Sequence, residues 1–162
     1  MPHWPGLLGI SRAVLINSAR ATLAAVASML LSQSLKLPEF YWAPISAIVV
    51  ILSTVNPRTI AWQRFVGTAL GAALGALITT YFHPTWIVYG AGIFVCGILS
   101  ALLRIGTAYR FAAITFSIVL LIAHTRPPWI IAVHRFVEVS VGIAVALIVA
   151  VAWPAPADSP AD

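Results

Sequence analysis

The chain has 162 residues, of which 61% are hydrophobic and only 8% charged, and its formal net charge is +5. Soluble globular domains carry about 25% charged residues, so this composition excludes an ordinary soluble domain and indicates an integral membrane protein with the lipid bilayer as its first partner. The nine Lys and Arg residues are scattered singly, which argues against nucleic-acid binding because tracking a phosphate backbone requires a basic cluster.

The pattern of apolar runs divides the chain into three parts. Residues 1–16 are expected to form an interfacial N-terminal segment, residues 17–154 a membrane domain, and residues 155–162 a disordered tail rich in Pro, Ala and Asp. A transmembrane helix needs roughly 20 mostly apolar residues, and charged residues and turn formers cut the membrane domain into six such segments. The predicted spans are about 17–36, 40–56, 62–82, 86–103, 107–124 and 129–153.

Turn signals fix these boundaries. Lys36-Leu37-Pro38-Glu39 ends the first span because proline lacks the helix donor, and Asn56-Pro57-Arg58 closes the second. Residues 65–103 contain no Asp, Glu, Lys or Arg and are too many for one helix, so His83-Pro84 divides them into two. The second and fifth spans are short, and short paired segments point to a transporter's binding site. The predicted fold class is all-α: a polytopic, multi-pass membrane protein with six transmembrane helices.

Cationic residues in the loops predict that both termini are cytoplasmic. With the N-terminus inside, six cations lie on the inside and three on the outside, as the positive-inside rule requires. The inside set is Arg12, Arg20, Arg58, Arg64, Arg104 and Arg110. The outside set is Lys36, Arg126 and Arg135.

The two halves of the chain resemble each other faintly. One stretch, Gln63-Arg64-Phe65-Val66, returns 71 residues later as His134-Arg135-Phe136-Val137, with Gly71 matching Gly142. At an offset of 68, Lys36 pairs with Arg104, Tyr41 with Tyr109, and Arg58 with Arg126. Chance is the alternative, since apolar segments resemble one another. A repeated unit of three spans would place the second copy upside down, and such inverted repeats are typical of secondary transporters.

Glycines supply the strongest packing signal. Gly67, Gly71 and Gly75 recur every four residues in the third span, and Gly142 is the counterpart in the sixth. This spacing puts them on one helix face, where another backbone can approach closely. Helix packing is the favoured interpretation, and lining of a pore is the alternative.

Residues 20–80 resemble the opening of the fusaric acid resistance family, or FUSC, of the aromatic acid exporters. The resemblance is carried by Arg20-Ala-Thr-Leu-Ala, Leu37-Pro38-Glu39-Phe40-Tyr41-Trp42-Ala43, Ile48-Val49-Val50 and Gln63-Arg64-Phe65-Val66-Gly67-Thr68-Ala69-Leu70-Gly71-Ala72. It implies efflux of small organic anions, especially aromatic carboxylic acids, across a bacterial inner membrane. Larger members carry the six-span unit twice, so a single unit implies a homo-oligomer, with a dimer restoring twelve helices.

An aromatic anion needs a cation for its carboxylate and a flat apolar wall for its ring. Arginine suits the first task because its fork binds carboxylates bidentately, and the candidates are Arg64, Arg20 and Arg110. Tyr41, Trp42 and Tyr109 could contact the ring. The alternatives are that the arginines are anchors that extend to the headgroups, and that the aromatic residues form an interfacial belt.

Glu138 is the only acid well inside a predicted span. An intramembrane carboxylate is costly and is functional by default, and burial favours its protonated form, which would suit a proton carrier. The alternative is a static pair with Arg135, three residues earlier on the same helix face.

Other chemistry is absent from the sequence. No phosphate loop, nucleophile elbow or metal-ligand spacing occurs, so we expect no enzyme activity, metal or cofactor. Two further functions stay open beside the exporter. One is a non-transporting scaffold or regulatory membrane subunit, and the other is a small anion channel.

Overall fold

The computed structural model describes residues 12–122 and 126–155. Helices joined by turns make up these residues, with no strand among them. The predicted all-α class is thereby confirmed. The helices are α1 (Arg12–Ser34), α2 (Trp42–Ile51), α3 (Pro57–Tyr81), α4 (Trp86–Leu102), α5 (Tyr109–Ile122) and α6 (Pro128–Ala152), with a short 3₁₀ turn, η1 (Gly106–Ala108), before α5. Most of the predicted N-terminal segment and tail, residues 1–11 and 156–162, and the last residues of the fifth predicted span lie outside the described ranges.

Three helix ends differ from the predicted span boundaries. α1 already begins at Arg12, so residues 12–16 of the predicted interfacial segment are helical and continuous with the first predicted span. α2 ends at Ile51, before the predicted end of the second span. Pro57 opens α3, because a proline at the first helical position forfeits no hydrogen bond and the Asn56 side chain accepts from the Arg58 N–H at 2.9 Å.

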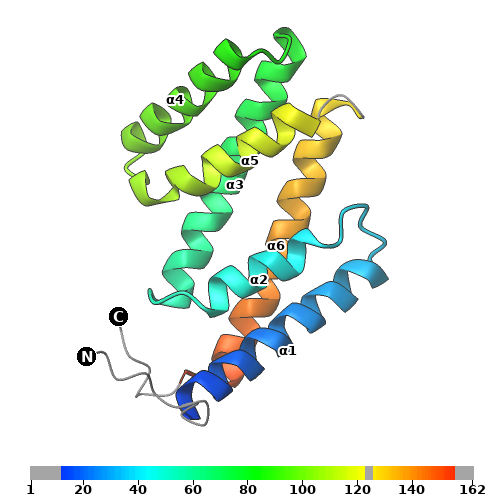
Figure 1. Ribbon diagram of the computed structural model, residues 1–162, viewed down its shortest axis with the longest axis vertical. Helices are drawn as coiled ribbons and strands as arrows, with labels where there is room; N and C mark the ends of the chain where they lie inside the picture. Colours follow the sequence, from blue (N-terminus) through cyan, green and yellow to red (C-terminus); the bar gives the residue numbers. More distant parts are fainter. Residues whose placement is uncertain (1–11, 123–125, 156–162) are drawn as a thin grey trace, which may run out of the picture.

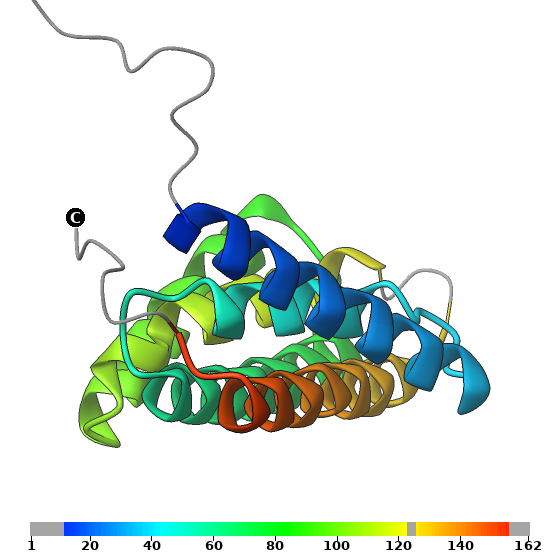
Figure 2. The same ribbon diagram turned by 90° about the horizontal axis from the view of Figure 1, so that it is seen from below.

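Successive helices run in alternating directions (Figure 1). The start of α1, the end of α6 and the α2–α3 connection lie at the lower left, and the α4–α5 connection lies at the left. The α3–α4 connection lies at the top, and the α1–α2 connection, the end of α5 and the start of α6 lie at the right. Seen from below, α3 and α6 run side by side in one layer, and the remaining helices cover one face of that pair (Figure 2). The long α3 packs against α5 and α6, and α6 packs against α2 and α1.

The two halves of the chain are built alike. α3 and α6 have 25 residues each, and both their first and their last residues are separated by 71 positions. α1 and α4 end at residues separated by 68 positions, and both are followed by a left-handed residue, Lys36 with φ 53° and Arg104 with φ 56°. The closing hydrogen bonds also match, since Leu37 N–H donates to Ser32 O and Ile105 N–H to Ser100 O. Both sequence offsets therefore coincide with repeated backbone structure.

The glycines lie where helices touch. A Cβ on Gly71 would collide with the carbonyl oxygen of Ala112 in α5, and a Cβ on Gly142 would collide with that of Ala43 in α2. Gly67 faces the carbonyl oxygen of Ala108 in η1 and the Cβ of Phe111 in α5, and Gly75 faces the Val119 side chain in α5. These glycines pack the long helices against the short ones, and none of them lines the cavity described below.

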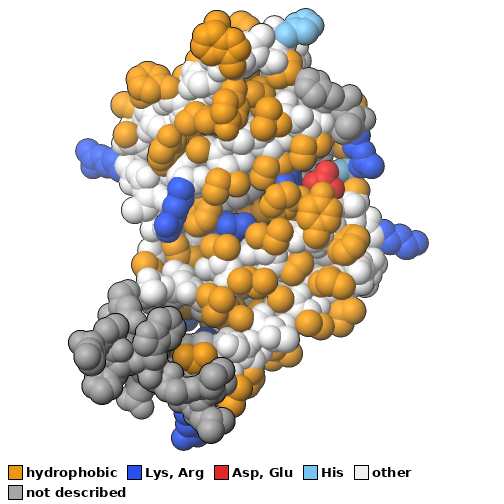
Figure 3. All heavy atoms as spheres, viewed as in Figure 1, with side chains coloured by type: hydrophobic (Ala, Val, Ile, Leu, Met, Phe, Trp, Pro, Cys, Tyr) orange, Lys and Arg blue, Asp and Glu red, His pale blue; other side chains and the backbone are white. Residues whose placement is uncertain are grey.

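The surface is rich in exposed apolar side chains. Among the described residues, α1 and α6 are each long and apolar enough to cross a membrane. α2 and α5 have only 10 and 14 residues, or about 15 and 21 Å at 1.5 Å per residue, less than a bilayer core of about 30 Å. Figure 3 shows apolar side chains spread over the face that carries α1, α2, α4 and α5, with most basic groups toward its margins.

Candidate functional site

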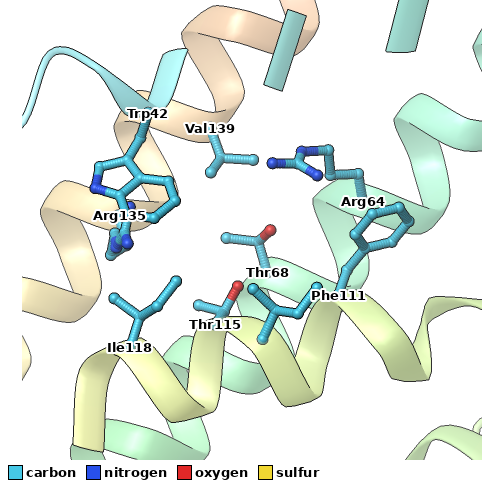
Figure 4. A pocket seen from close by; sticks show the side chains of 9 residues that line it. Trp42, Arg64, Thr68, Phe111, Thr115, Ile118, Arg135 and Val139 are labelled. Atoms are coloured by element: carbon cyan, nitrogen blue, oxygen red, sulfur yellow. The ribbon is translucent and has the colours of Figure 1, made fainter. Parts of the chain in front are cut away.

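A small cavity lies where the two short helices meet the two long ones. Figure 4 shows its lining side chains converging from α2, α3, α5 and α6. They are Trp42, Arg64, Thr68, Phe111, Ile114, Thr115, Ile118, Arg135 and Val139. The space open to the centre of a water-sized sphere is about 20 Å³, which is room for about one water molecule.

Arg64 occupies one side of the cavity. Its Nη2 donates to Ser46 Oγ at 3.1 Å, and its guanidinium carbon lies 5.1 Å from the centre of the Phe111 ring. Its Nε is buried and has no hydrogen-bond partner. Within the described ranges no carboxylate forms an ion pair with Arg64, and the charged side chains near it are also arginines, Arg135 in the same cavity and Arg110 on the same Phe111 ring, so this cation is available to an anion.

Arg135 occupies the opposite side, with the guanidinium carbon stacked 3.3 Å from the centre of the Trp42 ring. It is 2% exposed. Its ion pair is with Glu39, Nε to Oε2 at 4.0 Å, and not with Glu138 as the static-pair alternative proposed. This Arg135–Glu39 ion pair is longer than the 2.7–2.9 Å of a charge-assisted hydrogen bond, and Nε and Nη2 of Arg135 accordingly have no hydrogen-bond partner.

Glu138 is fully buried beside this cluster. Its Oε1 accepts the backbone N–H of Glu39 at 2.9 Å, and its Oε2 has no partner. The Glu39 side chain, in turn, accepts from Trp42 Nε1 at 3.1 Å and is 20% exposed. The turn between α1 and α2 is thereby attached to α6 through two glutamates.

The two sides of the cavity are structural equivalents. Arg64 and Arg135 each follow the first residue of their helix by seven positions. The Arg64 guanidinium lies against the Phe111 ring, and the Arg135 guanidinium lies against the Trp42 ring. In both cases the next residue along the chain is an alanine that packs on a glycine of the long helix, Ala112 on Gly71 and Ala43 on Gly142. The equivalence stops at charge, because both glutamates lie on the Arg135 side. The site therefore has one uncompensated cation and one cation held among carboxylates.

Several predicted binding residues lie elsewhere. Arg20 is 2% exposed, but its Nε donates to the carbonyl oxygen of Trp153 at 2.7 Å, at the end of α6. Arg110 is exposed, with its guanidinium carbon 5.0 Å from the Phe111 ring, so it reaches the same ring as Arg64 from outside the cavity. Tyr41 and Tyr109 are exposed and do not line the cavity. The structure thus brings together Arg64, Trp42 and Arg135, with Glu138 adjoining.

The sequence alone did not single out Phe111, the two threonines or Glu39. Phe111 could have been found from the repeat, as the counterpart of Trp42, had one extra residue been allowed in the turn before the short helix. Thr68 and Thr115 carry no signal that separates them from other small residues in apolar runs. Glu39 was assigned to a turn, and its role emerges only when that turn folds onto α6.

Comparison with known proteins gives one match. No curated protein sequence and no solved structure matches the chain. The family described as fusaric acid resistance protein-like matches residues 24–149, which is most of the chain and includes every residue that lines the cavity. The chain belongs to this family, whose members are membrane transport proteins.

Proposed function

We propose that this protein is an exporter subunit for small organic anions in the inner membrane of a bacterium, with both termini in the cytoplasm and six helices that carry the chain across the membrane six times, the short α2 and α5 crossing only together with their connecting turns. The alternating helix directions support this topology. So does the distribution of cations, because Arg58, Arg104 and Arg110 lie at the connections on the same side as the start of α1. In this orientation the second three-helix unit is inverted with respect to the first.

One observation carries the proposal. Two guanidinium groups, held on antiparallel helices, reach one cavity from opposite sides (Figure 4), and Arg64 has no anionic partner among the described residues. A partly buried cation without a counter-ion is costly in a membrane interior, and an anion in the cavity would reduce that cost. Thr68 and Thr115 add hydroxyl groups to the lining, which suits a carboxylate better than a purely apolar cargo.

The cargo we favour is an aromatic carboxylate. The Trp42 and Phe111 rings line the cavity beside the two arginines and would give an aromatic ring flat apolar surfaces. Arg110, exposed and in contact with the same Phe111 ring, would attract anions toward Arg64 from the cytoplasm. Since the cavity holds about one water, the helices must part for a ring to pass. The two glycine-mediated contacts between long and short helices are where such a movement would occur.

We further propose that Glu138 couples export to protons. Its buried carboxylate has one oxygen without a partner, and it lies beside an arginine that already pairs with another acid. A proton on Glu138 removes a negative charge from this cluster and makes the cavity more attractive to an anion. Loss of that proton has the opposite effect, so the proton and the anion bind and leave together, and the coupling we propose is outward co-transport of both, driven by a higher concentration of the anion inside the cell.

A homodimer is the assembly we propose. The outer surface of α3 and α6 carries a shallow apolar groove of mostly small residues, namely Ala69, Ala72, Ala73, Ala132, Val133 and Phe136. Small residues let membrane helices approach closely, so a second copy could pack there. A dimer would have twelve helices and two cavities.

Growth protection tests the exporter function. Cells that express the chain should tolerate a membrane-permeable aromatic acid such as benzoic acid better than cells without it. Arg64→Ala should abolish this protection at an unchanged protein level in the membrane. Arg58→Ala is the matched control, since Arg58 is an exposed arginine of the same helix. Full protection by Arg64→Ala would refute the assignment of the site.

A small anion channel is the second candidate, and the narrowness of the cavity favours it. The cavity has room for about one water molecule and is lined by two guanidinium groups. A small inorganic anion could pass such a constriction without any large rearrangement of the helices. Chloride conductance of the purified chain in a planar bilayer, unchanged in Glu138→Gln, would favour the channel. Strict dependence of flux on Glu138 would favour the coupled exporter.

A further inference from the structure

The two ends of the cavity differ in charge in a way that the repeat does not explain. Among the described residues the Arg64 end contains no carboxylate, whereas Glu39 reaches the Arg135 end from the turn between α1 and α2. At the place equivalent to Glu39, in the turn between α4 and α5, the chain has only Gly106, Thr107 and Ala108. The buried Glu138 of α6, whose equivalent in α3 is Gly67, adds to the difference, but Glu39 is the acid that contacts Arg135.

The Glu39 carboxylate is placed as a bound anion would be. Its Oε2 lies 4.0 Å from Arg135 Nε and accepts the Trp42 indole N–H. Arg135 and Trp42 both line the cavity, so the acid occupies the groups that a carboxylate cargo would need at that end. It is also the one of the two described glutamates that reaches the surface, because Glu138 is fully buried. Figure 3 shows acidic side-chain atoms at one place on the face it draws.

The contact is built to be replaced. A carboxylate that holds an arginine firmly does so with short, often bidentate hydrogen bonds, but here Nε and Nη2 of Arg135 make no hydrogen bond at all. A cargo carboxylate that met these donors directly would make better contacts than Glu39 does. Displacement of Glu39 would also loosen the turn from α6, because the Glu39 backbone N–H is bonded to Glu138.

We propose that Glu39 is a tethered competitor of the transported anion: its carboxylate occupies Arg135 and keeps closed the end of the cavity that lies away from the termini. This inference rests on the proposed anion transport and adds a gating residue to it. The Arg64 end, which has no such acid, is the end at which cargo binds first. Cargo that reaches Arg135 displaces Glu39 and opens the way out.

Two measurements on Glu39→Gln in the full chain test this. The first is the KM for radiolabelled 4-sulfobenzoate, an aromatic carboxylate whose second, permanent charge keeps it from crossing lipid unaided, offered to each face of oriented proteoliposomes. It should fall about tenfold, the scale of one charge-assisted contact, at the face of the α1–α2 turn, and change less than about twofold at the other face. Lys36→Asn, a charge change in the same turn at a left-handed residue, is the control and should change neither value.

The second measurement does not require transport. Ile118→Cys in a Cys96→Ser background places one thiol in the cavity lining. A membrane-impermeant thiol reagent should label it about tenfold faster in Glu39→Gln, again only from the face of the α1–α2 turn. If Glu39→Gln fails to accumulate, Glu39→Asp should give the same asymmetry, because its shorter side chain moves the charge away from Arg135.

The outcomes separate the two proposals. A chain that does not transport the labelled anion but shows the one-sided labelling keeps Glu39 as a gate and refutes the proposed cargo. If the anion is transported, but Glu39→Gln changes neither the KM at either face nor the labelling rate, the gate is overturned and transport stands. A lower maximal rate of transport in Glu39→Gln, with an unchanged KM and normal protein levels, also overturns the gate, since that would make Glu39 a structural residue.

Discussion

Replacement of Arg64 by glutamine is the most informative single change. Glutamine keeps a donor for Ser46 Oγ but removes the charge that lines the cavity. A carboxylate about 4 Å from the guanidinium would gain about 4 kcal/mol at an effective dielectric constant of 20, and the net worth of a hydrogen bond to a charged group is about 1.5–3 kcal/mol. The lower range applies, because Arg64 is only partly buried and Arg135 remains in place.

That loss should weaken anion binding about 10- to 150-fold, at about 1.4 kcal/mol for each factor of ten. The assay is the KM for radiolabelled 4-sulfobenzoate, which does not cross lipid unaided, in proteoliposomes that contain equal amounts of folded wild-type or Arg64→Gln protein. Arg58→Gln, on the same helix and exposed, should keep the wild-type KM within about a factor of two. A wild-type KM in Arg64→Gln, or an equal rise in Arg58→Gln, would refute the reasoning.

Two further predictions concern packing and topology. Gly71→Ala and Gly142→Ala place a Cβ against a backbone carbonyl, so each should lower the free energy of unfolding in detergent by about 1–3 kcal/mol. Gly90→Ala, with open space around it, should be neutral or slightly stabilising. Equal effects at the three sites would contradict the helix contacts. In a Cys96→Ser background, an impermeant thiol reagent should label Lys36→Cys only from outside the cell and Arg104→Cys only from the cytoplasm, since the two residues end equivalent helices of inverted units. Labelling of both from one side would contradict the inversion.

Sequence reasoning worked where the signal is a repeated local pattern. The left-handed residues Lys36 and Arg104 end their helices in the same way, and the pairing of Arg64 with Arg135 reproduces the offset of α3 and α6. Local chemistry of this kind, a helix end or a fixed position within a helix, depends on few neighbours. It therefore survives in the sequence as a spacing.

It failed where a residue's role depends on a distant segment. Pro57 has the same local chemistry at the end of one helix and the start of the next, and only the Asn56 cap decides between them. Arg20 could face a cavity or a helix end, and its bond to the carbonyl of Trp153 is 133 residues away in sequence. Glu39 and Glu138 are 99 residues apart, so no spacing rule could join them.

Uptake by the purified chain alone tests the central claim most directly. Liposomes that contain only this protein would be given radiolabelled 4-sulfobenzoate, whose permanent charge keeps it from crossing lipid unaided, and an imposed pH gradient, with Glu138→Gln as the matched variant. We expect the wild-type chain to accumulate this anion against its concentration gradient, and Glu138→Gln to lose that accumulation while it still exchanges the anion across the membrane. Absence of any flux from folded protein, or flux that ignores both the gradient and Glu138, would contradict a proton-coupled exporter.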